Sequence, residues 1–204
     1  MRLAALLVSI VLAASPTLAQ VGAAKAAPSE AMSTAQAQIV AIDLFESICV
    51  HTEDHSSAKN QARSLGFFYA PPVLSGLLSE MRIEDGSVLM KAFDGAFALA
   101  MTGVAPNGRP EFSDQVCAVG IAPSAETINA AVEKFLDVGP PQSQAGAPII
   151  WYKNEGKKRV RLEQTGLRGA DVRKGLRPRA VIVQSVATPF GPTALVTQLE
   201  TRPR

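Results

Sequence analysis

The chain has 204 residues, of which 47% are apolar and 19% are charged, and its formal net charge is +2. This is enough apolar material for a packed core and too little charge for a disordered chain. Two cysteines and two histidines exclude a disulfide-dense scaffold, a zinc-finger array and a cysteine-ligated iron–sulfur cluster. The composition therefore predicts a globular protein with few chemically specialised residues.

The first 19 residues have the pattern of a secretory signal peptide. Arg2 precedes an apolar run over residues 3–14, and Pro16 with the small residues after it offers a cleavage site near Ala19. The alternative is an uncleaved anchor, but the run is too short to span a bilayer. No later stretch has the length of a transmembrane helix, so none is expected after cleavage. The sequence predicts a periplasmic or secreted bacterial protein.

Residues 20–37 are small and polar with no apolar period, and we interpret them as a flexible leader. Residues 38–204 then form a single domain, which begins with helices. Four helices are expected, over residues 39–50, 55–65, 73–82 and 125–138. Asp54 can cap the second of them, and Gly66 can end it.

Strands dominate the rest of the domain. They are expected over residues 87–93, 96–102, 114–121, 148–153, 158–165, 180–187 and 193–200. Asp94-Gly95 is a strong hairpin signal between the first two strands. Residues 166–179 lack an apolar period and are expected to form a long basic loop. The pattern predicts an α+β fold, a mostly antiparallel sheet of about seven strands packed by about four helices.

The two cysteines, Cys49 and Cys117, are expected to form one disulfide bond, because an even pair in an exported protein is most simply oxidised. Cys49 shares a helix face with Ile42 and Phe45, and Cys117 alternates with Val119 on one strand face. A helix joined to the sheet beneath it satisfies both patterns. The alternatives are two buried free thiols or a reactive cysteine, and the absence of a CxxC motif argues against a redox role.

The runs IDLFESICV and QVCAVGI carry a resemblance to a family. The chain resembles small uncharacterised exported proteins of Gram-negative bacteria, in which a cysteine of the first helix and a strand cysteine recur. The match covers mainly residues 40–66 and 114–121, with a looser likeness through the C-terminal strands. The resemblance implies a periplasmic α+β domain with one helix-to-strand disulfide, and it implies no catalytic residues.

Charge is distributed unevenly along the chain. Residues 20–152 carry 7 basic against 14 acidic side chains, whereas residues 153–204 carry 12 against 4. The basic side chains proposed to bind an anion are Lys157, Lys158, Arg159, Arg161, Arg173, Lys174, Arg177 and Arg179. Their partner would be an anionic envelope component or an acidic protein. Nucleic acid is not expected, because the segment lacks interleaved aromatic residues. The alternative is a solvated loop without a partner.

One short segment could bind a metal. His51 and His55 are four residues apart with Glu53 between them, so on one helix the two rings could share a divalent ion. The segment falls at an expected helix break, however, and the chain has no third histidine. The alternative is a polar turn in which Asp54 caps the next helix. Ser56 and Lys59 also match the S-x-x-K pattern of penicillin-binding enzymes, but the companion motifs are missing.

These observations favour a non-enzymatic binding or envelope-maintenance protein, and we assign no catalytic residue and no cofactor. The first alternative is a metal-assisted hydrolase that uses His51 and His55. The second is a binder of anionic envelope surfaces through residues 157–179.

Overall fold

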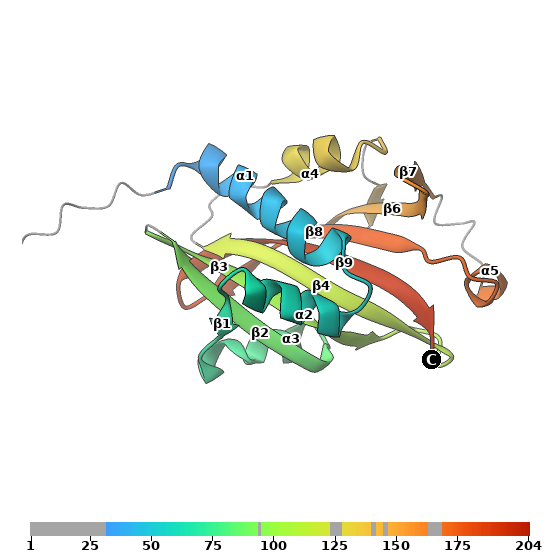
Figure 1. Ribbon diagram of the computed structural model, residues 1–204, viewed down its shortest axis with the longest axis horizontal. Helices are drawn as coiled ribbons and strands as arrows, with labels where there is room; N and C mark the ends of the chain where they lie inside the picture. Colours follow the sequence, from blue (N-terminus) through green and yellow to red (C-terminus); the bar gives the residue numbers. More distant parts are fainter. Residues whose placement is uncertain (1–31, 94, 123–127, 140–141, 145–146, 163–168) are drawn as a thin grey trace, which may run out of the picture.

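The computed structural model describes residues 32–204 except 94, 123–127, 140–141, 145–146 and 163–168. One antiparallel sheet of nine strands forms its centre, in the order β1-β2-β3-β4-β9-β8-β6-β5, with β7 paired to β6 (Figure 1). The expected α+β fold with an antiparallel sheet is confirmed, with two strands more than predicted.

The nine strands are β1 (Phe68–Tyr69), β2 (Glu84–Phe93), β3 (Ala96–Pro106), β4 (Phe112–Ala122), β5 (Gln142–Gln144), β6 (Ala147–Glu155), β7 (Lys158–Arg161), β8 (Arg179–Thr188) and β9 (Gly191–Pro203). The Asp94-Gly95 hairpin is confirmed, since Phe93 pairs with Ala96 across it. The strand expected over residues 158–165 ends at Arg161, and residues 163–168 lie outside the described part. The additional strands β1 and β5 are two and three residues long.

The helical segments are α1 (Thr34–Phe45), a π-helical turn η1 (Glu46–Val50), α2 (His55–Ser64), a 3-10 turn η2 (Pro72–Leu74), α3 (Gly76–Glu80), α4 (Asn129–Leu136) and α5 (Gly169–Arg173). Asp54 caps α2 as expected, because its carboxylate accepts a hydrogen bond from the backbone N–H of Ser57. Gly66, with φ +86°, follows the end of α2. The segment expected as one long basic loop contains α5 and, at Arg179, the start of β8.

The first helix begins at Thr34, inside the segment 20–37 that was expected to be a flexible leader. Ser33 and Gln36 form a capping box, in which each side chain accepts a hydrogen bond from the other residue's backbone N–H. Ala37 is buried against the main core. A cap followed by small residues starts a helix without apolar periodicity, and tertiary contact then holds it.

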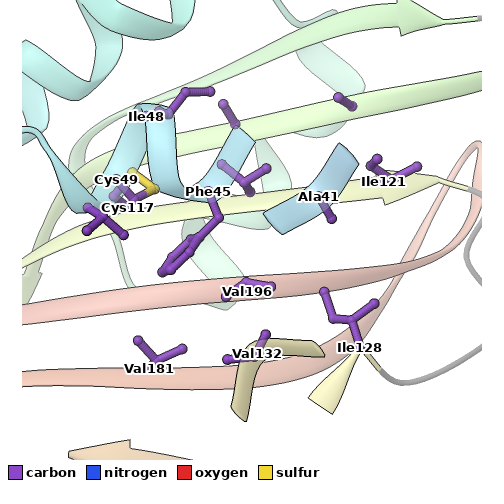
Figure 2. Packing of buried hydrophobic residues seen from close by; sticks show 14 of the residues in the cluster. Ala41, Phe45, Ile48, Cys49, Cys117, Ile121, Ile128, Val132, Val181 and Val196 are labelled. Carbon is purple, nitrogen blue, oxygen red and sulfur yellow. A yellow bond between two sulfur atoms is a disulfide. The ribbon is translucent and has the colours of Figure 1, made fainter. Parts of the chain in front are cut away.

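The main core lies between one face of the sheet and helices α1, α2 and α4 (Figure 1). Phe45 and Ile48 are fully buried in it, and Figure 2 shows the Phe45 side chain directed toward the strands. The disulfide between Cys49 and Cys117 is confirmed and joins η1 to β4, with a Cα–Cα distance of 5.5 Å. Val181 on β8 faces the same core.

A second, smaller core lies on the opposite face of the sheet. There η2 and α3 cover β2, β3 and β4 through Leu74 and Leu77, which pack with Leu99 and Met101 of β3. Figure 1 draws α3 fainter than α1 and α2, as expected for an element behind the sheet. The sheet therefore has apolar residues on both faces of its central strands, which explains the near-continuous apolar sequence of β3 and β4.

Candidate functional site

A groove of about 440 Å³ opens on the α3 side of the sheet, beside the second core. We call it the sheet groove. Its lining residues come from α3 and the turn after it, and from β3, β4, β8 and β9. They are Glu80, Met81, Arg82, Ala105, Pro106, Asp114, Val116, Ile182, Gln184, Ser185, Val186, Thr197 and Leu199. Its volume lies within the range of small-molecule sites.

Strand register explains the floor of the sheet groove. Val116 pairs with Leu199, and Thr197 pairs with Ile182, on neighbouring strands. Side chains alternate between the two faces of a strand, so these four point away from the disulfide-bonded face. Leu199 and Ile182 are only partly buried. The result is an apolar floor that is in part open to solvent.

The end of α3 forms one wall of the groove, and its position is held tightly. The chain reverses at Arg82, which has φ +55°, and the Ile83 N–H then donates to the Leu78 carbonyl at 2.7 Å. The Ile83 side chain packs against Gly103 of β3. A Cβ atom added to Gly103 would stand 2.3 Å from the Ile83 Cγ2 atom. Only glycine allows this contact. Arg82 occupies a left-handed position where glycine is usual, and its side chain lines the groove.

The floor contains one polar atom without a partner. Thr197 is 2% exposed, and its Oγ1 atom makes no hydrogen bond with any described residue. Leaving a buried hydroxyl unsatisfied costs free energy, so such groups are rare in folded proteins. The Oγ1 atom has almost no accessible surface, so a molecule in the groove would contact other atoms of the floor and not this hydroxyl.

Polar side chains lie at both ends of the groove. At one end, the Asp114 carboxylate accepts hydrogen bonds from Asn107 Nδ2 at 2.9 Å and from Thr201 Oγ1 at 2.7 Å. Glu80 and Arg82, which line the groove from α3 and the turn after it, make no ion pair with another described residue. Gln184, which is uncharged, lines the other end, while its neighbour Ser185 is directed toward the opposite face of the sheet. The groove therefore offers apolar contact along its floor and hydrogen bonds or charge at its ends.

The structure gives the two histidines separate partners. The His51 ring lies 3.5 Å from the Glu46 carboxylate on the surface, whereas His55 Nδ1 lies 2.9 Å from Gln115 Oε1 on β4. In the described part of the chain, no three His, Cys, Asp or Glu side chains lie together as a metal site would require. Glu53 is exposed, and its backbone carbonyl accepts a hydrogen bond from Arg202.

Asp54, at the centre of this segment, has a local structural role. Hydrogen bonds from the Ser57 side chain and backbone hold the pKa of the Asp54 carboxyl below its ordinary value. A cavity of about 20 Å³ under His55 reaches the disulfide and has room for a single water molecule. The segment therefore connects α1 to α2 and fixes both to the sheet.

Several basic residues proposed to bind an anion have partners within the protein. Arg159 donates to the Phe135 carbonyl at 2.8 Å and stacks over the Phe135 ring, and Arg173 lies 3.1 Å from the Glu111 carboxylate. Arg161 is half-buried beside Gly139. Of the eight residues proposed to bind an anion, Lys157, Lys158 and Lys174 are exposed and make no ion pair with another described residue.

Three arginines surround a buried glutamate that sequence reasoning missed, and two of them, Arg177 and Arg179, are among the residues proposed to bind an anion. Arg179 and Arg202 each contact the Glu200 carboxylate at 2.7 Å, and Arg177 lies 3.7 Å from it. Glu200 is 3% exposed. The sequence contained a signal for this cluster, because Glu200 stands at an inward position of a mostly apolar strand, and a buried acidic side chain needs a charged partner. Nearby, the Tyr152 hydroxyl donates to Gln198 at 2.9 Å, and burial raises the pKa of Tyr152.

No protein-family model, curated protein or solved structure matches this chain. None of the helices in the described ranges combines the length and the hydropathy needed to cross a membrane. The function is therefore inferred from the geometry of the sheet groove and its surroundings.

Proposed function

We propose that the chain is an exported, non-catalytic binding protein that holds a small amphipathic molecule in the sheet groove. The observation that carries this proposal is the hollow of about 440 Å³, whose floor includes the partly exposed side chains of Ile182 and Leu199. A pre-formed, mostly apolar hollow with a few polar groups is the usual form of a ligand site. The signal-like first 19 residues and the disulfide, which suits an oxidising compartment, support export.

Binding can be tested with an environment-sensitive apolar dye, anilinonaphthalene sulfonate. Saturable binding of one dye per chain is expected for the purified protein with its disulfide intact. Ile182→Lys places a charge on the groove floor and should abolish the binding. Ile39→Lys is the matched control, because Ile39 is 61% exposed on α1, and it should leave dye binding unchanged. Equal binding by both variants would contradict the proposal.

Export has its own test, which is independent of the ligand. Expressed from its full sequence in a Gram-negative host, the mature chain should be recovered from the periplasm or medium with Gln20 at its N-terminus. Recovery in the cytoplasm with Met1 retained and both thiols reduced would contradict export.

A second role, binding to an anionic envelope surface, is supported by the exposed basic side chains. Changing Lys157, Lys158 and Lys174 to alanine should weaken salt-sensitive sedimentation with vesicles that contain phosphatidylglycerol. Arg159→Ala is the control, because Arg159 contacts Phe135 inside the protein. If the triple variant binds as well as the parent chain, this second role is excluded.

A further inference from the structure

We propose that the edge of the sheet at β1 inserts into the interface of an anionic lipid bilayer. The inserting surface consists of Phe68 and Tyr69 on β1 and Val73 on η2, and we call it the edge patch. Figure 1 shows β1 on the side of the sheet away from β6 and β7. The inference therefore concerns neither the sheet groove nor the exposed lysines around β7.

Exposed large apolar side chains are concentrated in the edge patch. Four such side chains are exposed among the described residues, and three of them lie within residues 68–73. Phe68, Tyr69 and Val73 are 52%, 56% and 67% exposed. The fourth, Ile39, stands alone on α1. Single exposed apolar residues are common on folded proteins, whereas an exposed group of them indicates an interaction surface.

The edge patch is held rigidly although its side chains are exposed. Leu74 and Leu77, which follow Val73, are buried in the second core and anchor η2 and α3 to the sheet. The Leu74 N–H donates to the Pro71 carbonyl at 3.0 Å, and the rings of Pro71 and Pro72 fix the backbone of the turn. A surface that is ordered before contact loses little conformational entropy when it docks.

The charged side chains around the edge patch are basic. Three charged residues lie on α2, β1, η2 and the second half of β2, and they are Lys59, Arg63 and Lys91. The Arg63 guanidinium lies 5.7 Å from the centre of the Tyr69 ring, and the Lys91 ammonium donates to a carbonyl at the end of α2 at 2.7 Å. Asp54 and Glu80 lie before α2 and at the end of α3, and Asp94, after β2, is outside the described residues.

This combination is complementary to a bilayer with anionic head groups. Phe and Tyr rings bury their apolar part at the boundary of the acyl chains, and the Tyr hydroxyl stays in the hydrated layer. Basic side chains beside them are attracted to the negative surface potential of the lipid. The edge patch supplies both kinds of contact from one side of the molecule.

Neither an added peptide strand nor a second copy of the chain suits this edge. The Ala70 N–H donates to the Val88 carbonyl of β2, so by alternation only Tyr69 directs its backbone groups outward. Pro71 and Pro72 have no N–H group to offer to another strand. A symmetric dimer through the edge patch would bring the basic side chains of both copies together, which is unfavourable. A bilayer avoids both problems, because it contacts side chains and is itself anionic.

Sedimentation with vesicles that contain phosphatidylglycerol tests the contribution of the apolar side chains. The double variant Phe68→Ser/Val73→Ser should bind about tenfold more weakly than the parent protein, or less, because two large apolar groups are lost. Arg63→Gln should weaken binding roughly fivefold, and this loss should vanish in high salt. Ile39→Ser is the matched control and should bind as the parent does. All four positions are exposed, so each variant should keep the melting temperature of the parent.

Insertion itself is measured by fluorescence quenching in vesicles of brominated lipids. In Val73→Trp the new indole should be quenched when the protein binds. The parent protein, whose single tryptophan, Trp151, lies on β6, gives the baseline. Ile39→Trp is the matched control on α1, and its indole should not be quenched beyond that baseline.

Each outcome either supports the inference or overturns it. Equal binding by Phe68→Ser/Val73→Ser and the parent protein overturns it, and so does quenching of Val73→Trp that does not exceed that of Ile39→Trp. If only the triple lysine variant loses vesicle binding, the second role stands and the edge patch is not a membrane surface. If the parent protein binds no vesicles but forms a dimer that Phe68→Ser/Val73→Ser cannot form, a second copy covers the patch and the inference fails. Dye binding to the sheet groove is unaffected by any of these results.

Discussion

Replacing Glu200 by glutamine should be among the most destabilising single changes outside the apolar core. The substitution keeps the size and shape of the side chain but removes the charge that faces Arg179 and Arg202. In the native protein each guanidinium contacts the carboxylate through two nitrogens, at 2.7 to 2.8 Å. The variant leaves two positive groups close together beside a neutral amide.

The magnitude follows from how little water reaches these groups. The side chains of Glu200, Arg179 and Arg202 are 4%, 12% and 22% exposed. Removing one partner of a fully buried pair costs about 3–5 kcal/mol, and partial solvation of Arg202 lowers this, so we expect a loss of about 3 kcal/mol. Arg177 is 57% exposed and lies 3.7 Å from the carboxylate. Arg177→Ala should therefore cost less than about 0.5 kcal/mol.

Urea unfolding at neutral pH measures both losses as free energies of unfolding, and thermal unfolding should show a melting temperature lower by roughly 6–12 °C for Glu200→Gln. Arg177→Ala is the matched control, because it removes a charge from the same cluster at the surface. If the two variants lose equal stability, solvent already screens the Glu200 carboxylate, and the assignment of a buried ionic network is wrong.

Three further predictions concern the disulfide, a buried tyrosine and a helix cap. Replacing Cys49 and Cys117 together by serine should lower the free energy of unfolding by about 4 kcal/mol, from a sequence separation of 68 residues; a loss below about 1 kcal/mol in urea unfolding would refute the estimate. Burial raises the pKa of Tyr152 above its ordinary value of 10.0. The stability that the neutral Tyr152 side chain contributes is therefore complete below pH 10.0 and is lost as pH rises through the folded-state pKa. The free energy of unfolding of Tyr152→Phe should not show this loss between pH 9 and 11, and identical pH profiles of stability for the variant and the parent protein would contradict the prediction. Asp54→Ala should cost about 1 kcal/mol at pH 7. Because the pKa of Asp54 is lowered from 3.8, the stability that its carboxylate contributes should disappear as pH falls through that lowered pKa. The free energies of unfolding of Asp54→Ala and of the parent protein, measured at decreasing pH, should therefore converge.

Features that depend on neighbouring residues could be predicted from the sequence. Asp54 starts α2 and Gly66 ends it, because capping and a left-handed turn involve only a few adjacent residues. The hairpin at Asp94-Gly95 follows from turn chemistry in the same way. The disulfide could be predicted because only one pairing of two cysteines is possible.

Other elements depend on contacts with distant parts of the chain. The short strand β5 exists because Gln142–Gln144 pair with β6, and nothing in those residues favours a strand. The start of α1 at Thr34 depends on Ala37 being buried against the sheet. The basic segment shows the same limit, since its composition could not reveal that Arg159 would contact Phe135 and Arg179 would contact Glu200.

The sequence by itself determined the class of fold, the single cross-link and the uneven charge, because each depends on composition, spacing or local geometry. The sheet groove was decided only by the tertiary structure. Its floor takes alternate residues from strands that lie far apart in the sequence, and the order β4-β9-β8 sets which of them meet. Alternation along β9 shows that Thr197 faces the side opposite Val196. Only the neighbouring strands and the end of α3 form a hollow of ligand size on that side of the sheet.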